Sequence, residues 1–236
     1  MTEMRQWIET LLVPAFGLDA AQVDKFVRYY DLLIDWNSRM NLTAITEPRA
    51  VAEKHFYDSL LITQSIHFQP DERLIDIGSG AGFPGIPLAI ACPRVQIDLL
   101  DSLGKRVRFL EAVAEDLGLD NVSAYHDRAE LFCKGARRES YDWAIARAVA
   151  ALPVLCEYAL PFVREGGSFI ASKGPRGMQE LDEAARAMQA LGGRYELHFH
   201  HDLPGGEARD YFLIKKIAPT PKRFPRKPGE AMRKPL

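Results

Sequence analysis

After Pro70 the chain alternates between short apolar runs and stretches with helical spacing. Seven apolar runs can be read, and they are RLIDIG, VQIDLLD, NVSAYH, YDWAIARA, GSFIASK, RYELHFHH and DYFLIKKI. Strands that alternate with helices predict parallel β-α-β units, whose crossover helices cover both faces of one sheet. Only DLPGGEAR separates the last two runs, which is too short for a parallel crossover, so we expect them to pair antiparallel. The sequence therefore predicts an α/β fold with a seven-stranded, mostly parallel sheet whose last strand is reversed.

The region before this alternation has helical patterns. Apolar residues recur every three or four positions between Ala20 and Trp36, and Asp19 is placed to cap that helix. A second helix is expected from Pro48, a good first-turn residue, through Leu61. We therefore expect three regions, which are an N-terminal helical extension (1–68), an α/β domain (69–218) and a tail (219–236).

Later helices are expected from Leu103 to Leu117, from Leu152 to Val163 and from Met178 to Leu191. Seven strands with the seventh reversed are typical of the class I methyltransferase fold, a Rossmann-like arrangement. A six-stranded, all-parallel dinucleotide-binding fold fits the pattern less well.

Composition indicates an ordinary globular protein, with 47% hydrophobic and 26% charged residues. The three cysteines are widely spaced and form no C-x-x-C pair, which argues against a disulfide framework or a zinc site. No apolar run approaches the ~20 residues that a membrane span needs, and the first residues do not resemble a signal peptide. We expect a cytoplasmic monomer that does not bind membranes.

The tail differs in charge from the rest of the chain. Its eighteen residues contain six Lys or Arg, one Glu and five prolines, whereas the chain as a whole has a net charge of −2. A basic segment on an acidic body suggests a polyanionic partner such as RNA. The alternative is a tail that is merely solvated.

A glycine cluster follows the first predicted strand, in the segment LIDIGSGAGFPGIPL. Gly78, Gly80 and Gly82 give the spacing G-x-G-x-G, whereas the NAD fingerprint needs a third glycine where Phe83 stands. Glycines at such a turn let the backbone approach a ligand closely. Asp76, just before the loop, suits a ligand with ammonium and sulfonium groups better than a pyrophosphate. The loop therefore favours S-adenosylmethionine as cofactor.

Later strand ends supply further candidates for the cofactor site. Asp101 ends the second strand, where a carboxylate accepts hydrogen bonds from ribose hydroxyls. Ala129 and Glu130 follow the third strand, where a backbone N–H and a carboxylate can line an adenine pocket. They can equally be the start of a helix, since acids are favoured there by the helix dipole.

Two basic residues lie at the ends of the next strands. Arg147 ends the fourth strand among apolar neighbours, where an unpaired cation would be costly to bury, and Lys173 follows the fifth strand. Each can meet the carboxylate of the cofactor or a substrate phosphate. As a structural alternative, Arg147 can pair with Asp76 or Asp101.

The sequence shows no catalytic machinery of another kind, and it assigns no catalytic residue. His198, His200 and His201 lie on a late strand where alternation sends neighbours to different faces, so no metal site is expected. Methyl transfer from a sulfonium to an atom without a proton needs orientation and little acid–base help. Guanine N7 is such an atom, so the absence of other machinery favours an acceptor of this type.

From about Tyr30 onward the chain resembles the RsmG (GidB) family of bacterial small-subunit ribosomal RNA guanine-N7 methyltransferases. The matching segments are WNSRMNLTAIT, HFYDSL, DIGSGAGFPGIPLAI, LLDSLGKRVRFL, RAE, ARAVA, KG and the closing PRKPG...KPL. The glycine motif is shared by many methyltransferases, whereas WNSRMNLTAIT and LLDSLGKRVRFL are much more specific.

The resemblance implies a class I fold with an N-terminal helical extension, S-adenosylmethionine as cofactor, and methylation of N7 of a guanine in 16S ribosomal RNA. By position it implies cofactor contacts at Gly78, Phe83, Asp101, Ala129, Glu130 and Arg147. The partner would be small-subunit ribosomal RNA or the ribosomal subunit. The basic tail and Lys105, Arg106 and Arg108 would neutralise phosphates, and Phe224 would stack on a base. The alternatives are a class I methyltransferase that acts on a small molecule, and an inactive fold that only binds RNA.

Overall fold

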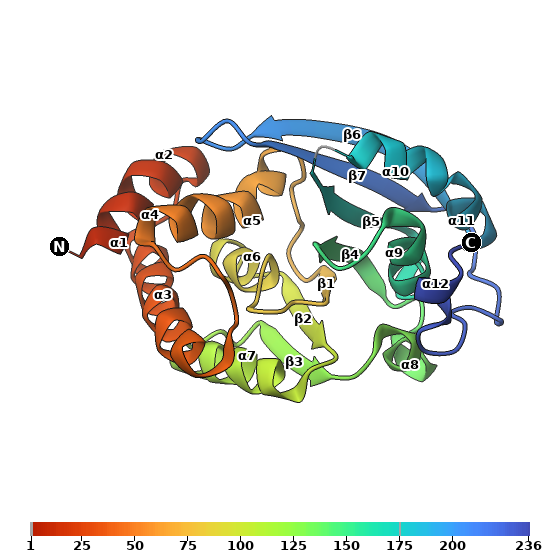
Figure 1. Cartoon of the computed structure of the whole chain (residues 1–236), viewed down its shortest axis with the longest axis horizontal. Coiled ribbons are helices and arrows are strands. Elements are labelled where there is room, and N and C mark those ends of the chain that lie inside the picture. Colours follow the sequence, from red (N-terminus) through yellow and green to blue (C-terminus); the bar gives the residue numbers. More distant parts are fainter. Residues whose placement is uncertain (1, 175) are drawn as a thin grey trace.

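The computed structural model describes residues 2–174 and 176–236. Within these residues the strands form one seven-stranded sheet of order β3-β2-β1-β4-β5-β7-β6 (Figure 1). The strands are β1 (Arg73–Ile77), β2 (Gln96–Asp101), β3 (Val122–His126), β4 (Tyr141–Arg147), β5 (Val163–Lys173), β6 (Gly193–Asp202) and β7 (Ala208–Lys216). The first five strands pair in parallel, and β7 is antiparallel to both β5 and β6. The predicted fold is confirmed.

Helices precede the sheet and alternate with its strands. The helical segments before β1 are α1 (Glu3–Trp7), η1 (Ile8–Leu12), α2 (Val13–Phe16), α3 (Ala20–Met40), α4 (Pro48–Val51), η2 (Ala52–Tyr57), α5 (Asp58–Leu60) and η3 (Leu61–Gln64). Those that follow are α6 (Gly85–Ala91), α7 (Gly104–Asp116), α8 (Ala129–Phe132), η4 (Gly135–Arg137), α9 (Leu152–Ala159), α10 (Gly177–Glu183), α11 (Ala185–Ala190) and α12 (Glu230–Arg233).

Most helices begin and end where local sequence signals place them. Asp19 caps α3 as predicted, and Gln22 completes a capping box by bonding back to the Asp19 main chain. Pro48 occupies the first turn of α4, and the helical path runs on almost without a break to Gln64. The helix expected from Leu152 ends earlier than predicted, because β5 already begins at Val163. The helix expected from Met178 is divided at Ala184 into α10 and α11.

The two faces of the sheet have different covers. On one face, strand residues pack in an apolar cluster with the N-terminal helices and with α6 and α7. On the opposite face, a second apolar cluster contains residues of α9, α10 and α11. Strand alternation explains the division, since Tyr211 and Leu213 enter the first cluster and Phe212 and Ile214 the second. The N-terminal helices therefore share one hydrophobic core with the sheet.

The tail folds back against the body rather than extending into solvent (Figure 1). Phe224 is only 5% exposed and belongs to the second apolar cluster. Arg226 donates to the buried carboxylate of Glu157, and Arg138 donates to the Phe224 carbonyl at 2.9 Å. The expectation that Phe224 stacks on a base is therefore wrong for this conformation, since its ring lies in the protein interior.

Among the residues that the structure describes, no helix is both long and apolar enough to cross a membrane.

Candidate functional site

The glycine loop lies where β1 ends, beside the end of β2. The amide of Gly78 donates to the Leu100 carbonyl at 2.8 Å, so the loop starts as a continuation of the β1–β2 ladder. Gly78 and Gly80 have φ values of +74° and +62°, which L side chains rarely adopt. A Cβ added at Gly80 would meet only the Gly78 carbonyl, at 3.8 Å, so the backbone is open to an approaching group there.

Asp101 fixes this loop to the end of β2. One carboxylate oxygen accepts from the Gly80 amide at 2.9 Å, and the other accepts from the Leu103 amide at 2.8 Å. Arg106 lies 3.5 Å from the same carboxylate. One of the basic side chains that were expected to meet RNA therefore forms an ion pair with Asp101 in this structure. Each carboxylate oxygen can accept more than one hydrogen bond, so Asp101 keeps acceptor capacity for a ribose hydroxyl.

Asp76 and Gly82, two of the predicted site residues, are buried in the protein interior. Asp76 is fully buried, and one of its carboxylate oxygens accepts from the Gly85 amide at 2.9 Å while the other has no hydrogen-bond partner. Burial raises the pKa of the Asp76 carboxyl to about 7. At Gly82 a Cβ would approach the Tyr29 hydroxyl of α3 to 2.7 Å, so this glycine permits close packing of α3 under the loop.

A small cavity of about 120 Å³ opens beside the loop at the carboxyl ends of β1, β2 and β3. We call it the small cavity, and its lining residues are Ile77, Gly78, Leu100, Ser102, Asp127, Arg128, Ala129, Glu130, Val149 and Tyr158. Gly78, predicted from the end of the first strand, and Ala129 and Glu130, predicted from the end of the third, meet here. The lining combines apolar side chains with a few polar groups, which is the mixture that a nucleoside site requires.

The Glu130 carboxylate is held by the tail. It accepts from the Gly229 amide at 2.9 Å, and the Arg128 guanidinium lies 3.3 Å away. Burial on its own would raise the pKa of Glu130, but these hydrogen bonds hold it below its ordinary value. Glu130 is therefore an ionised residue that links α8 to the tail, and it also lines the small cavity.

A larger cavity of about 580 Å³ lies next to the small one, above β4 and β5. We call it the basic cavity, and its lining residues are Lys54, His55, Asp58, Arg147, Ala148, Val149, Ala150, Ala151, Ser172, Lys173, Gly174, Arg176, Glu180 and Arg209. Five basic side chains outnumber two acidic ones. Val149 lines both cavities and so forms their common wall. The preceding Ala148 has a φ of +56°, a backbone conformation that is uncommon for a non-glycine residue.

Arg147 and Arg209 are both anchored by Asp58. The Arg147 Nη1 lies 3.0 Å from one oxygen of this buried carboxylate, and the Arg209 Nε donates to the other oxygen at 2.9 Å. The structural alternative proposed for Arg147, a pair with Asp76 or Asp101, is therefore wrong. Lys173 pairs with Glu180 at 2.8 Å and donates to the Ala150 carbonyl at 2.6 Å.

Phe83 joins the loop to the basic cavity. The His55 ring stacks on Phe83 with centroids 4.4 Å apart, and the Arg147 guanidinium lies over the same ring at 5.3 Å. Burial and the nearby Arg147 charge lower the pKa of His55 to about 4, so this imidazole is neutral at pH 7. Phe83 acts as an apolar wall between the loop and the N-terminal helices.

Sequence reasoning missed the roles of Asp58, Val149 and Arg209. Asp58 lies in HFYDSL, a segment that carried the family resemblance, and an acid in such an apolar run is a signal for a buried ion pair. Its partners are 89 and 151 positions away, so no local signal in the sequence could identify them.

A seven-stranded sheet with β7 reversed, together with an open glycine loop and a small cavity at the same sheet edge, defines a class I S-adenosylmethionine-dependent methyltransferase. Comparison with a family model then identifies the family: residues 22–202 match "rRNA small subunit methyltransferase G". The chain belongs to this family, and the predicted family and cofactor are confirmed.

Curated relatives of the same description extend the match to nearly the whole chain. The chain is 46% identical to a ribosomal RNA small subunit methyltransferase G of Alkaliphilus metalliredigens over 224 residues, covering 94% of this chain and 93% of that relative. It is 45% identical to the protein of the same name from Halalkalibacterium halodurans over 238 residues, covering 100% and 99%.

Solved structures support the fold at much lower identity. An O-methyltransferase from Bacillus cereus, solved in complex with SAH, has a TM-score of 0.58 at 16% identity and covers 91% of this chain and 98% of that chain. TYW2 of M. jannaschii, solved with AdoMet, has a TM-score of 0.52 at 14% identity and covers 68% and 77%.

Proposed function

We propose that this protein transfers a methyl group from S-adenosylmethionine to N7 of a guanine in small-subunit (16S) ribosomal RNA. In this proposal the small cavity holds the adenosine of the cofactor and the basic cavity receives the flipped-out nucleotide. The observation that carries the proposal is that a cationic cavity shares a wall, Val149, with the cofactor cavity.

The basic cavity has the size and charge that a nucleotide requires. Arg147 and Arg209 each use part of their hydrogen-bonding capacity on Asp58, and a guanidinium has five N–H donors. The remaining donors are available to a phosphate or to the acceptor atoms of a base. A small neutral substrate would not need this charge, which is why the RNA substrate is favoured over a small molecule.

Every acidic or imidazole side chain that lines the described part of the basic cavity already has partners. Asp58 is engaged by two guanidinium groups, and Glu180 is engaged by Lys173 and by the Leu152 amide. The His55 Nδ1 donates to its neighbour's carbonyl at 3.2 Å, and its Nε2 lies 2.9 Å from the Thr43 hydroxyl. A cavity without an uncommitted base suits an acceptor atom that has no proton to lose, and guanine N7 is such an atom.

The residues of the chain then act mainly by orientation. When bound, S-adenosylmethionine supplies a methyl group on a positively charged sulfur, and the guanine N7 lone pair forms the new bond as the carbon–sulfur bond breaks. The glycine loop and Asp101 would hold the nucleoside, and Val149, which lines both cavities, would lie between it and the acceptor. Arg147 and Arg209 hold the phosphate or base in line with the methyl group, so catalysis is positioning of the two reactants.

Mapped methylation tests the proposal directly. Protein is incubated with tritiated S-adenosylmethionine and either small ribosomal subunits or naked 16S RNA, and the labelled nucleotide is located by nuclease digestion. The expected result is a single 7-methylguanosine. Label that appears only on protein or small molecules, or on a different atom of the RNA, refutes the proposal.

Asp58→Asn tests the role of the basic cavity separately. The substitution removes the negative charge that orients both guanidinium groups, so we expect kcat/KM for RNA to fall by about tenfold or more. Affinity for S-adenosylhomocysteine, measured by calorimetry, should stay within about twofold because Asp58 does not line the small cavity. The matched control is Asp116→Asn, which removes an exposed carboxylate paired with Arg28 and should leave both values unchanged. A wild-type kcat/KM for RNA in Asp58→Asn would mean that the basic cavity does not bind the methyl acceptor.

The tail must be tested by charge substitution and not by deletion. Deleting Pro219–Leu236 would expose the core around Phe224, so loss of activity would say nothing about RNA. Lys222, Arg223 and Lys227 are exposed and can be changed without disturbing that packing. Unchanged RNA methylation at all salt concentrations after these three changes would show that these three side chains do not contribute to RNA binding.

A further inference from the structure

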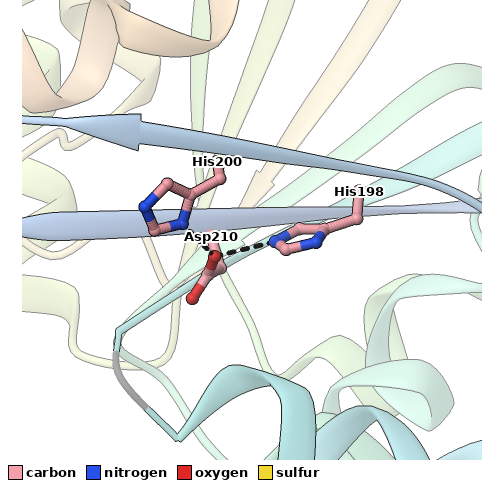
Figure 2. A group of neighbouring side chains, drawn as sticks. All are labelled: His198, His200 and Asp210. Carbon is pink, nitrogen blue, oxygen red and sulfur yellow. Dashed lines mark hydrogen bonds and ion pairs between the residues drawn. The ribbon is translucent and has the colours of Figure 1, made fainter.

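Two histidines and an aspartate converge on the ribbon formed by β6 and β7 (Figure 2). None of the three lines either of the cavities described above. His198 and His200 are two positions apart on β6, so their side chains lie on the same face, and His200 is directly opposite Asp210 of β7. One oxygen of Asp210 lies 2.7 Å from the His198 Nε2 and 2.8 Å from the His200 Nδ1.

The surroundings of Asp210 make this more than a pair of surface hydrogen bonds. Asp210 is 7% exposed, and within residues 2–174 and 176–236 its ion pairs are with these two imidazoles and with no lysine or arginine. Lys173 is its register partner on β5, but that side chain pairs with Glu180 instead. The neighbouring Arg209 points to the other face, toward Asp58. Among the described residues, the ion-pair partners of this buried carboxylate are thus two imidazoles, which can be neutral. A bound cation would balance the negative charge of Asp210.

The three side chains are also held in place. The His198 ring stacks on the buried Phe212 at 5.0 Å, with 25° between the ring planes. The outward Nε2 of His200 lies 3.8 Å from Asp202, where a carboxylate can orient a metal-bound imidazole through its second nitrogen. His200 itself is exposed, so water can reach the remaining coordination positions.

Two imidazole nitrogens and one carboxylate oxygen are a common ligand set for Zn²⁺ and related ions, with a solvent molecule as fourth ligand. The three ligand atoms lie within 4.8 Å of one another. Ligands at ~2.0 Å from a tetrahedral ion are ~3.3 Å apart, so on binding each nitrogen would move about half an ångström away from the Asp210 oxygen and the two nitrogens would approach each other. Each coordinating nitrogen must lose its N–H, and that proton moves to the other ring nitrogen or to solvent.

We propose that His198, His200 and Asp210 form a binding site for one divalent transition-metal ion, Zn²⁺ in the first instance, which clamps β6 to β7. The site is structural: it fixes the ribbon from which Arg209 reaches Asp58 and the basic cavity. The sequence pattern predicted no metal site on this strand, because it could not show that Asp210 lies opposite His200 and within reach of His198. The inference does not depend on the proposed RNA substrate.

Calorimetric titration of Zn²⁺ into metal-stripped, full-length protein tests the site, with the visible absorption of bound Co²⁺ as a second readout. Wild type should bind one ion, and Asp210→Asn and His198→Gln should each weaken binding by about tenfold or more. The matched control is His201→Gln, which removes an imidazole from the same strand but from the other face, where it meets Ser65 at 2.7 Å.

Thermal unfolding distinguishes a built site from binding to scattered surface groups. Saturating Zn²⁺ should raise the midpoint of wild type and of His201→Gln but not that of Asp210→Asn. The proposal is overturned if wild type binds no Zn²⁺, or if Asp210→Asn and His198→Gln bind it as tightly as wild type does. Equal binding of Mg²⁺, which prefers oxygen ligands, would also overturn it.

Discussion

Replacing Asp76 by asparagine should make the protein less sensitive to pH. Asp76 lies fully buried beneath the glycine loop, with one carboxylate oxygen bonded to the Gly85 amide and the other without a partner. Asparagine has the same shape, can present its carbonyl oxygen to Gly85, and carries no charge. The substitution therefore removes the titration and leaves the main hydrogen bond in place.

The size and sign of the effect follow from the pKa of Asp76. Burial raises it from 3.8 to about 7 in the folded protein, so the folded state prefers the protonated form. The contribution of this carboxyl to stability is complete below about pH 4 and is lost as the pH rises through 7. A shift of about three pKa units corresponds to about 4 kcal/mol in total. About 2 to 3 kcal/mol of this falls between about pH 5 and pH 8.

Urea unfolding of wild type and Asp76→Asn across this range measures the effect. The free energy of unfolding of wild type minus that of the variant should fall by about 2 to 3 kcal/mol as the pH rises from about 5 to 8. Asp116→Asn is the control, because Arg28 lowers the pKa of Asp116 and its titration is complete below this range. Parallel pH curves for wild type and Asp76→Asn would refute the reasoning, since they would mean that Asp76 is already ionised in the folded protein at pH 5.

Other substitutions test the tail and the loop. Phe224→Ala should lower the free energy of unfolding in urea by about 3 to 5 kcal/mol because a buried ring leaves a cavity, and a loss below about 1 kcal/mol would mean that the tail does not dock. Gly78→Ala should weaken S-adenosylhomocysteine binding by about tenfold or more in calorimetry, because its φ is +74° and the added Cβ would lie 2.6 Å from Val149; unchanged affinity would contradict the assigned position of the cofactor. Changing Lys222 and Arg223 together to glutamine should make the salt dependence of RNA binding shallower by about two units of log–log slope, and an unaltered slope would remove both from the RNA interface.

Local patterns were sufficient to predict the architecture. The alternation of apolar runs and helical spacing located the strands, and the short connection before DYFLIKKI predicted the reversed strand that the structure contains. Asp19 as a helix cap and Gly78 as a loop residue were likewise predictable, because each depends on residues within a few positions of itself. Such signals are local, so the sequence displays them directly.

Pairings between distant segments were not predictable in the same way. Periodicity indicates that Arg147 lies at a strand end, but it does not indicate that the partner is Asp58 of the N-terminal helices. The tail gives a second example, because its prolines and basic residues suggest solvation, whereas Phe224 anchors it in the core. In both cases the stabilising contact depends on how the sheet brings segments together, which no short window of sequence contains.

The hydrogen bond between Gly229 and Glu130 links two segments that lie 99 positions apart in the chain. Proteolytic trimming of the tail would therefore take a partner away from a residue that lines the small cavity. Damage to the tail should thus weaken binding of the methyl donor, although no described tail residue lines that cavity.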